Sequence, residues 1–433
     1  MGNLPKILVV SEEPFNWENG TGITLSNIFK GWDIERIANV YFTDRSAKKS
    51  EDICTKFYRL NRFANLPALG LRVLMLPILK RNIKMELPHI VPLSASEKSF
   101  QKKMLLNYLA GAELSPLIIS GSLWKWVKEY NPDMIYSMLG NGRVIKLTNL
   151  IASKANKPIL PHFTDDWPDC IYTQNEWMGV ARTIFNHELQ KLFSRSKHGL
   201  CISDQMTKEY IKRYKIPFTT VLNCVEDDFF VPPQQLNTET EPIVFVFTGW
   251  LHLNRWKSLL EIAEAIEAIN KNGFNAQLHI YCPEVNRASF SEKFNHLRST
   301  RFMGSVSSAQ VSEVLRLASV LVHVESFKEN IIQYTKLSLS TKIPQYMASN
   351  KPILAYGPSQ LASIQHIVNT NAGYAITSNN RDEMKKKIQT LIENKELRLS
   401  FANNGYIFAK ENHSQSKTHE RLRSVFLAYN SVN

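Results

Sequence analysis

Two hydroxyl side chains and a cation follow one another at Ser340, Thr341 and Lys342, directly before a short stretch with helical character. The free N–H groups and the positive end of a helix N-terminus attract phosphate groups. These residue types in this order therefore predict a diphosphate-binding site. Glu325 ends an apolar, β-branched run, 320–324, so we expect its carboxylate at the carboxyl end of a buried strand.

One strand–loop–helix–strand unit is expected to position these residues. Residues 320–324 and 353–356 read as two buried strands, and 343–349 reads as the helix between them, with Asn350 as its C-terminal cap. Residues 328–339 are interpreted as a polar loop. A ligand of such a unit binds at the carboxyl ends of its strands, against the helix N-terminus.

Asp165 and Asp166 are the carboxylates of the first half best placed for chemistry, because they follow a predicted strand, 158–160. One of them is expected to position an acceptor or to act as a base. The alternative is that they cap the turn before Trp167. His162 is interpreted as a packing residue at the end of the strand rather than as a catalytic base.

A loop that carries glycines, 11–22, follows the first predicted strand, 7–10, and precedes a helix. A loop in this position of an α/β domain is a common place to bind a polar ligand. Gly20, Thr21 and Gly22 are therefore candidate binding residues, and the alternative is that the two glycines serve an ordinary turn.

The bulk composition restricts the class of protein. A chain of 433 residues with 44% apolar and 21% charged residues is typical of a globular protein of two or three domains. Its 52 Lys and Arg against 39 Asp and Glu give a net charge of +13, which predicts anionic partners such as phosphates. No basic run is dense enough to indicate a nucleic-acid tail, so nucleic acid is not an expected partner.

The cysteines and the apolar segments indicate the compartment. Five scattered cysteines without a C-x-x-C pair predict neither a zinc site nor a disulfide framework, as in a reducing cytoplasm. The chain enters a strand too early for a signal peptide, and no apolar run reaches the roughly 20 residues of a spanning helix. We therefore expect a cytoplasmic protein.

The segment 66–84 is apolar and ends in three cations, Lys80, Arg81 and Lys84. An apolar element with a basic edge suits the interface of an anionic membrane, so peripheral binding to the inner face of the cell membrane is one interpretation. The other interpretation is a buried helix with a solvated end.

Strands that alternate with helices along the whole chain predict an α/β protein with doubly wound parallel sheets. A polar stretch marked by prolines, 226–242, reads as a linker. The expected domains are therefore 1–225 and 243–412, followed by a C-terminal helix in 413–433.

Several short motifs add to this organisation. In chain order they are Thr164-Asp165-Asp166, Gly199–Ser203, Asn223–Glu226, Thr248–Leu251 with Arg255 and Lys257 after it, and Glu325–Phe327. Together with the two α/β halves they resemble the GT-B glycosyltransferases, and more closely the large family-four group of retaining, nucleotide-sugar-dependent enzymes of the bacterial surface-polysaccharide type. The chain departs from that pattern with Cys224 for a glycine, Trp250 for an arginine, Thr164 for a histidine, and Gln345 for the second glutamate of a pair.

The resemblance implies two Rossmann-like domains that face a central cleft, with the C-terminal helix crossing back to the first domain. It implies that Arg255 and Lys257, with the hydroxyls and the cation at 340–342, bind the donor diphosphate. It gives Glu325 contacts with sugar hydroxyls and places Gln345 at the nucleotide ribose. A glutamine lacks the charge that strengthens such hydrogen bonds, so weaker nucleotide binding is expected there.

The function implied is hexosyl-type transfer, with retention, from a nucleotide sugar to a glycan or lipid-linked acceptor in polysaccharide biosynthesis. No metal and no cofactor beyond the donor substrate are expected, although Asp165 and Asp166 resemble a metal-binding pair. Two alternatives remain. One is a binding or scaffold subunit with weakened catalysis, which Gln345, Trp250 and Thr164 suggest, and the other is a nucleotide-sugar epimerase or hydrolase of the same fold.

Overall fold

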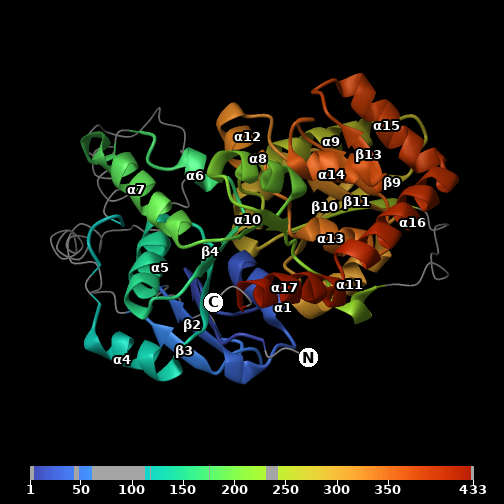
Figure 1. The fold of residues 1–433 in the computed structure, drawn as a ribbon. Coiled ribbons are helices and arrows are strands. Elements are labelled where there is room, and N and C mark those ends of the chain that lie inside the picture. Colours follow the sequence, from blue (N-terminus) through green and yellow to red (C-terminus); the bar gives the residue numbers. More distant parts are fainter. Residues whose placement is uncertain are drawn as a thin grey trace. The chain divides into compact units, whose positions relative to one another are not determined.

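The computed structural model describes residues 4–42, 48–60, 113–117, 119–174, 176–230 and 242–430. The chain divides into two compact units, which are Met1–Val221 with His419–Asn433 (unit 1) and Leu222–Thr418 (unit 2). Each unit contains one parallel sheet with helices, which confirms the expected α/β class (Figure 1). The segment 66–84 and residues 231–241 of the predicted linker lie outside the described residues.

The sheet of unit 1 has seven strands in the order β3-β2-β1-β4-β5-β6-β7. Its strands are β1 (Ile7–Ser11), β2 (Ile37–Tyr41), β3 (Lys56–Arg59), β4 (Met134–Leu139), β5 (Ile159–Phe163), β6 (Gly199–Cys201) and β7 (Phe218–Thr220). Strand β1 pairs in parallel with β2 on one side and with β4 on the other. The strand order therefore reverses between β1 and β4.

Several helices of unit 1 begin with side-chain caps that the sequence supplies, such as Asn19, Asn141 and Ser203. The helices described in this unit before the C-terminal one are α1 (Gly20–Phe29), α4 (Gly121–Tyr130), α5 (Gly142–Ala155), α6 (Trp167–Cys170), α7 (Val180–Ser194) and α8 (Asp204–Tyr214). In the described residues, short 3-10 turns cover Ile34–Arg36, Glu176–Gly179, Asp227–Phe229 and Ser291–Phe294.

The predicted loop at Gly20, Thr21 and Gly22 is wrong, because these residues form the first turn of α1. The side chain of Asn19 accepts a hydrogen bond of 2.9 Å from the N–H of Gly22 and so begins the helix three residues early. A Cβ atom at Gly22 would lie 2.1 Å from the amide nitrogen of Asn16. Gly22 thus permits a close packing contact with the Asn16 side chain. This contact explains why a glycine stands there, and no ligand is needed for that explanation.

The sheet of unit 2 has six strands in the order β10-β9-β8-β11-β12-β13. Its strands are β8 (Ile243–Thr248), β9 (Ala276–Tyr281), β10 (Thr300–Gly304), β11 (Val320–Val324), β12 (Ile353–Tyr356) and β13 (Gly373–Ile376). The central strands are continuous apolar runs because helices cover both faces of a parallel sheet. Here the order reverses between β8 and β11.

The helices of unit 2 complete the alternation. They are α9 (Arg255–Asn270), α10 (Glu284–Phe290), α11 (Ser308–Leu317), α12 (Glu329–Thr335), α13 (Lys342–Ala348), α14 (Ala362–Asn369), α15 (Arg381–Glu393) and α16 (Lys395–Asn412). Helix α13 packs against α16, and α15 packs against α9 (Figure 1). The expected polar loop 328–339 is wrong, because α12 forms there and buries Ile331 and Ile332.

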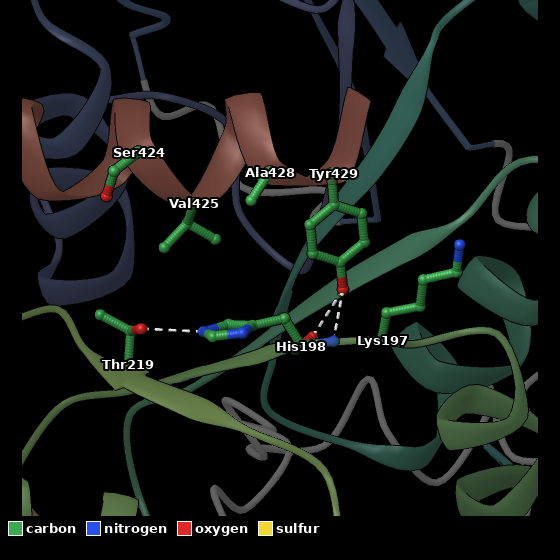
Figure 2. Close-up of a pocket in the computed structure, with 7 residues that line it drawn as sticks. All are labelled: Lys197, His198, Thr219, Ser424, Val425, Ala428 and Tyr429. Carbon is green, nitrogen blue, oxygen red and sulfur yellow. Dashed lines mark hydrogen bonds between the residues drawn. The ribbon is translucent and has the colours of Figure 1, made fainter. Parts of the chain in front are cut away.

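The last helix, α17 (Gln415–Asn430), returns the chain to unit 1, which confirms the predicted crossing. Its Phe426 is buried and packs edge-on against Trp32 at 5.3 Å between ring centroids. The hydroxyl of Tyr429 lies 2.7 Å from the carbonyl oxygen of His198 and accepts a hydrogen bond from its N–H at 2.9 Å (Figure 2). No helix in the described part of the chain is long and apolar enough to cross a membrane.

Candidate functional site

Strand order identifies one edge of unit 2 as the place to look for a ligand site. Ligands of open α/β sheets bind outside the carboxyl ends of the strands where the strand order reverses. In unit 2 these ends belong to β8 and β11. Gly249 follows β8, and Glu325 follows β11, so topology brings the two predicted motifs to one edge.

Glu325 forms a buried ion pair with Arg255, the first residue of α9. The guanidinium Nη2 of Arg255 lies 3.1 and 3.3 Å from the two carboxylate oxygens of Glu325. The Glu325 side chain is only 4% exposed and that of Arg255 14%. The hydroxyl of Ser258 donates a 2.8 Å hydrogen bond to the backbone oxygen of Glu325, which fixes the strand end against α9. This pairing turns Arg255 toward the edge of the sheet.

His323 stands beside this pair on the same face of β11. Its Nε2 lies 3.4 Å from Oε1 of Glu325. Burial alone would raise the pKa of Glu325, but the Arg255 charge and His323 outweigh it and lower that pKa to about 2. Burial lowers the pKa of His323, so the imidazole is neutral at pH 7. The charged partners at pH 7 are therefore the Glu325 carboxylate and the Arg255 guanidinium.

Lys342, the first residue of α13, brings a second cation to this edge. Its ammonium lies 4.6 Å from the ring centroid of Phe247. A Cβ atom at Gly249 would lie 2.1 Å from Nζ of Lys342, and Gly249 has a φ of +123°. Both facts require glycine at that position. Burial and, after it, the charge of Arg255 lower the pKa of Lys342 to about 7.

The other predicted donor-binding residues lie around this cluster with different contacts. Thr341 precedes Lys342, and its backbone oxygen accepts a 3.1 Å hydrogen bond from the side chain of Asn223. Ser340 and Gln345 are both partly buried, before and inside α13. Lys257 is exposed, and its ammonium lies 5.5 Å from the ring centroid of Trp256. The geometry therefore favours Arg255 and Lys342 as the cations of the site.

Sequence reasoning missed two residues of this site. His323 precedes Glu325 by two positions, and residues two apart in a strand share a face, so the period-2 pattern of the strand was the available signal. Tyr346 is buried in α13, and its hydroxyl accepts a 3.1 Å hydrogen bond from the N–H of Thr248. No local pattern indicates that contact, because it joins α13 to the end of β8.

Asp166 occupies a different kind of site, inside unit 1. Its carboxylate receives two hydrogen bonds from the guanidinium of Arg213, at 2.8 and 3.0 Å, and one of 2.9 Å from the hydroxyl of Tyr210. The Asp166 side chain is 6% exposed, and it makes no side-chain capping bond to α6. The structure therefore gives Asp166 the role of a buried ion-pair partner, and a catalytic role for Asp165 stays a prediction.

His162 is buried in unit 1, next to the last residue of β5. Its Nδ1 lies 2.6 Å from the hydroxyl of Tyr136, and burial lowers its pKa to about 4. A neutral, enclosed imidazole of this kind fits the expected packing role. Among the described residues, no group of three or more His, Cys, Asp or Glu is placed to hold a metal ion.

The Asp166 assignment predicts a loss of stability. Replacing Asp166 with alanine removes the bidentate partner of Arg213 and the acceptor of the Tyr210 hydroxyl, while Arg213 keeps its contacts with Asp169 and Glu209. Lost hydrogen bonds to a charged group cost about 1.5–3 kcal/mol. We expect a lower free energy of unfolding in urea for Asp166→Ala, while Asp165→Ala, at the partly exposed neighbour, changes it little. Equal stability of the two variants would contradict the structural role.

Comparisons with known proteins agree with this architecture. Residues 242–394 match the family model of the glycosyl transferases group 1, which covers most of unit 2. HepE of Anabaena, solved with UDP and glucose, is 14% identical and has a TM-score of 0.62, with 98% of this chain and 100% of that chain covered. No curated protein sequence matches the chain.

Two further solved structures share the fold. Sucrose-phosphate synthase from Thermosynechococcus elongatus is 10% identical with a TM-score of 0.63, with 99% of this chain and 100% of that chain covered. WaaG, a glycosyltransferase involved in lipopolysaccharide biosynthesis, is 11% identical with a TM-score of 0.55, with 97% and 99% covered. The chain therefore has the GT-B fold, as its motifs predicted.

Proposed function

We propose that the chain transfers a sugar from a nucleoside-diphosphate sugar to an acceptor hydroxyl. The observation that carries this proposal is the pair of cations, Arg255 and Lys342, at the sheet edge where the strand order of unit 2 reverses. The match to the group 1 glycosyl transferases over residues 242–394 supports it. So does the binding of UDP-glucose by HepE, a protein of the same fold.

The two cations suit the departing nucleoside diphosphate. Glycosyl transfer builds negative charge on the diphosphate and positive charge on the sugar ring. Arg255 is held in place by Glu325, and Lys342 is held against Gly249, so both charges are positioned before the donor arrives. A preorganised charge stabilises the transition state without the cost of reorganisation. Two protein cations also fit the proposal that no metal ion takes part.

In this mechanism Glu325 acts as a positioning residue for Arg255. Its two oxygens already bond the guanidinium, and its side chain is almost fully buried. The finer proposals rest on the resemblance. They are hexosyl transfer with retention to a glycan or lipid-linked acceptor, in polysaccharide biosynthesis, by a cytoplasmic protein that binds the membrane surface peripherally.

The test is direct. The purified full chain should bind UDP, GDP or ADP in a calorimetric titration, and with the matching sugar donor and a glycan acceptor it should form a glycoside that mass spectrometry detects. Arg255→Met should weaken the diphosphate binding, whereas Lys257→Met, at the exposed lysine near it, should not. Absence of both diphosphate binding and product would overturn the proposal.

A binding or scaffold role is the second candidate, because Gln345 stands in α13 where the resemblance expects a carboxylate. The two roles separate in one measurement. A scaffold subunit binds the nucleotide sugar and leaves it intact with acceptor present, whereas a transferase releases the nucleoside diphosphate.

A further inference from the structure

A second cluster of charged side chains lies in unit 1, at the sheet edge where the strand order reverses between β1 and β4. Glu12 follows β1, and Asn141 and Arg143 follow β4. One carboxylate oxygen of Glu12 lies 2.5 Å from Nη2 of Arg143, and the other accepts a 3.0 Å hydrogen bond from the side chain of Asn141. A carboxylate thus joins two loops at the carboxyl ends of neighbouring strands.

The Arg143 guanidinium lies over an aromatic ring. Its Cζ is 4.6 Å from the ring centroid of Phe42, which follows β2. The Arg143 side chain is 21% exposed and that of Glu12 24%, so solvent reaches both members of the pair. Arg143 Nε is buried and has no hydrogen-bond partner among the described residues. The pair is therefore partly open, with donor and acceptor capacity left on both side chains.

A second carboxyl group belongs to the same cluster. Glu113 accepts a hydrogen bond from the hydroxyl of Tyr172, and that hydroxyl would lie 2.7 Å from a Cβ atom at Gly142, between Asn141 and Arg143. Burial raises the pKa of Glu113 to about 7, against the lowering effect of Arg143, and the charge of Glu12 raises it further. Lys146, the next cation along α5, turns instead to the carbonyl oxygen of Leu114. The cluster therefore holds two carboxyl groups for one guanidinium, so its charge is neutral to negative.

This local balance is opposite to the net charge of +13 of the whole chain. Hydroxyl groups of a sugar can donate to the Glu12 carboxylate and accept from Arg143, and such hydrogen bonds to charged groups are the strong ones. A carboxylate or phosphate on the ligand would instead meet Glu12 and Glu113, and juxtaposed like charges reject a wrong partner.

We propose that Glu12, Asn141 and Arg143 bind the hydroxyl groups of a neutral sugar in the acceptor, and that Glu12 with Glu113 disfavours an acidic sugar at this place. The inference rests on the proposed glycosyl transfer, which it extends from the donor to the acceptor. It assigns a substrate class to residues of unit 1, whereas the proposed donor residues Arg255 and Lys342 belong to unit 2.

Saturation-transfer NMR on the full chain tests the proposal with simple probes. These are the methyl α-glycosides of glucose, galactose and mannose and the three matching methyl uronides. We expect at least one neutral glycoside to bind about tenfold more tightly than its uronide, because the uronide carboxylate would face the Glu12 carboxylate and like charges repel. Glu12→Gln, which keeps the shape of the side chain, should weaken neutral binding and reduce the preference. Arg143→Lys should weaken it as well.

Calorimetric titration with UDP, GDP and ADP provides the control, because it reports on the proposed donor site in unit 2. Both variants should keep the nucleoside diphosphate affinity of the parent chain, and their circular dichroism and urea unfolding should show that unit 1 is folded. A parent chain that binds a nucleoside diphosphate but no neutral glycoside, or that prefers uronides, overturns this inference and leaves the proposed transfer standing. Unchanged glycoside binding in Glu12→Gln and Arg143→Lys overturns it too. Loss of nucleoside diphosphate binding in the parent chain instead counts against the proposed transfer.

Discussion

Replacing Glu325 with glutamine should weaken nucleoside diphosphate binding by about tenfold or more, because the substitution removes the charge that holds Arg255. A glutamine has the same shape but only one acceptor oxygen, so the guanidinium loses its second bond and its fixed position. Titration calorimetry with UDP measures the effect. Glu329→Gln, at an exposed glutamate in α12, is the matched control and should bind as the parent chain does.

The same measurement separates two roles of Glu325. If Glu325 positions Arg255, UDP alone binds less tightly to the variant. If Glu325 instead contacts the donor sugar, as the motif resemblance implied, UDP binds normally and only UDP-sugar binding or turnover falls. We expect the first result, since the carboxylate is 4% exposed and both oxygens face Arg255. Normal UDP affinity in Glu325→Gln would refute the positioning role.

The free energy of unfolding provides a second test of the Arg255–Glu325 ion pair. Glu325→Ala leaves Arg255 without its buried partner and should cost about 3–5 kcal/mol in urea unfolding. The Glu325 pKa is about 2 in the folded chain against an ordinary 4.5, so its contribution is present above pH 4.5 and is lost as pH falls toward 2. Glu325→Gln should lack this acid-dependent component.

The local pattern of the sequence was sufficient to predict the unit around Glu325. The run 320–324 forms β11, and 353–356 forms β12, because continuous apolar runs of that length suit a sheet buried on both faces. The helix predicted over 343–349 is α13, displaced by one residue. The prediction of a polar loop before this helix was wrong, because α12 forms there and buries two isoleucines. The charged residues Lys328 and Glu329 beside them made the segment look polar.

The pairings inside the sites were beyond sequence reasoning, because each joins residues far apart in the chain. Arg255 meets Glu325 only because β8 and β11 are neighbours, although β9 and β10 separate them in sequence. Asp166 looked available for catalysis because its partner, Arg213, lies 47 residues later in α8, the helix that follows the next strand, β6. Strand order, which periodicity does not specify, decides both results.

Lys342 gives the prediction with the clearest pH signature, since its pKa of about 7 lies within the range of ordinary measurements. A diphosphate bound beside the ammonium favours its charged form and raises that pKa. Below pH 7 the lysine is already charged in the free chain, so its protonation no longer limits UDP affinity. Near pH 6 the affinity should fall again, because the UDP phosphate itself takes up a proton. As pH rises above 7, binding must take up a proton, and affinity should fall by up to about tenfold per pH unit.

Other groups do not produce this slope. The second pKa of a phosphate is about 6, so the ligand is fully ionised above pH 7. Burial lowers the pKa values of His252 and His323, so neither imidazole gains or loses charge in that range. The Arg255 guanidinium stays charged throughout. Among the groups described at this edge, Lys342 is therefore the one whose charge changes between pH 7 and 9.

Calorimetry in buffers of different ionisation enthalpy should show net proton uptake on UDP binding at pH 8, and no uptake at pH 6, where the lysine is already charged and the phosphate instead releases a proton. Lys342→Arg stays charged, so its UDP affinity should remain high and should no longer change with pH above pH 7. Lys342→Met has no charge at this position, so its UDP affinity should be low and also independent of pH in that range. Lys336→Met removes an exposed lysine nearby in the chain and should keep the parent profile. A pH slope that survives in Lys342→Met would assign the proton to another group and remove Lys342 from the diphosphate site.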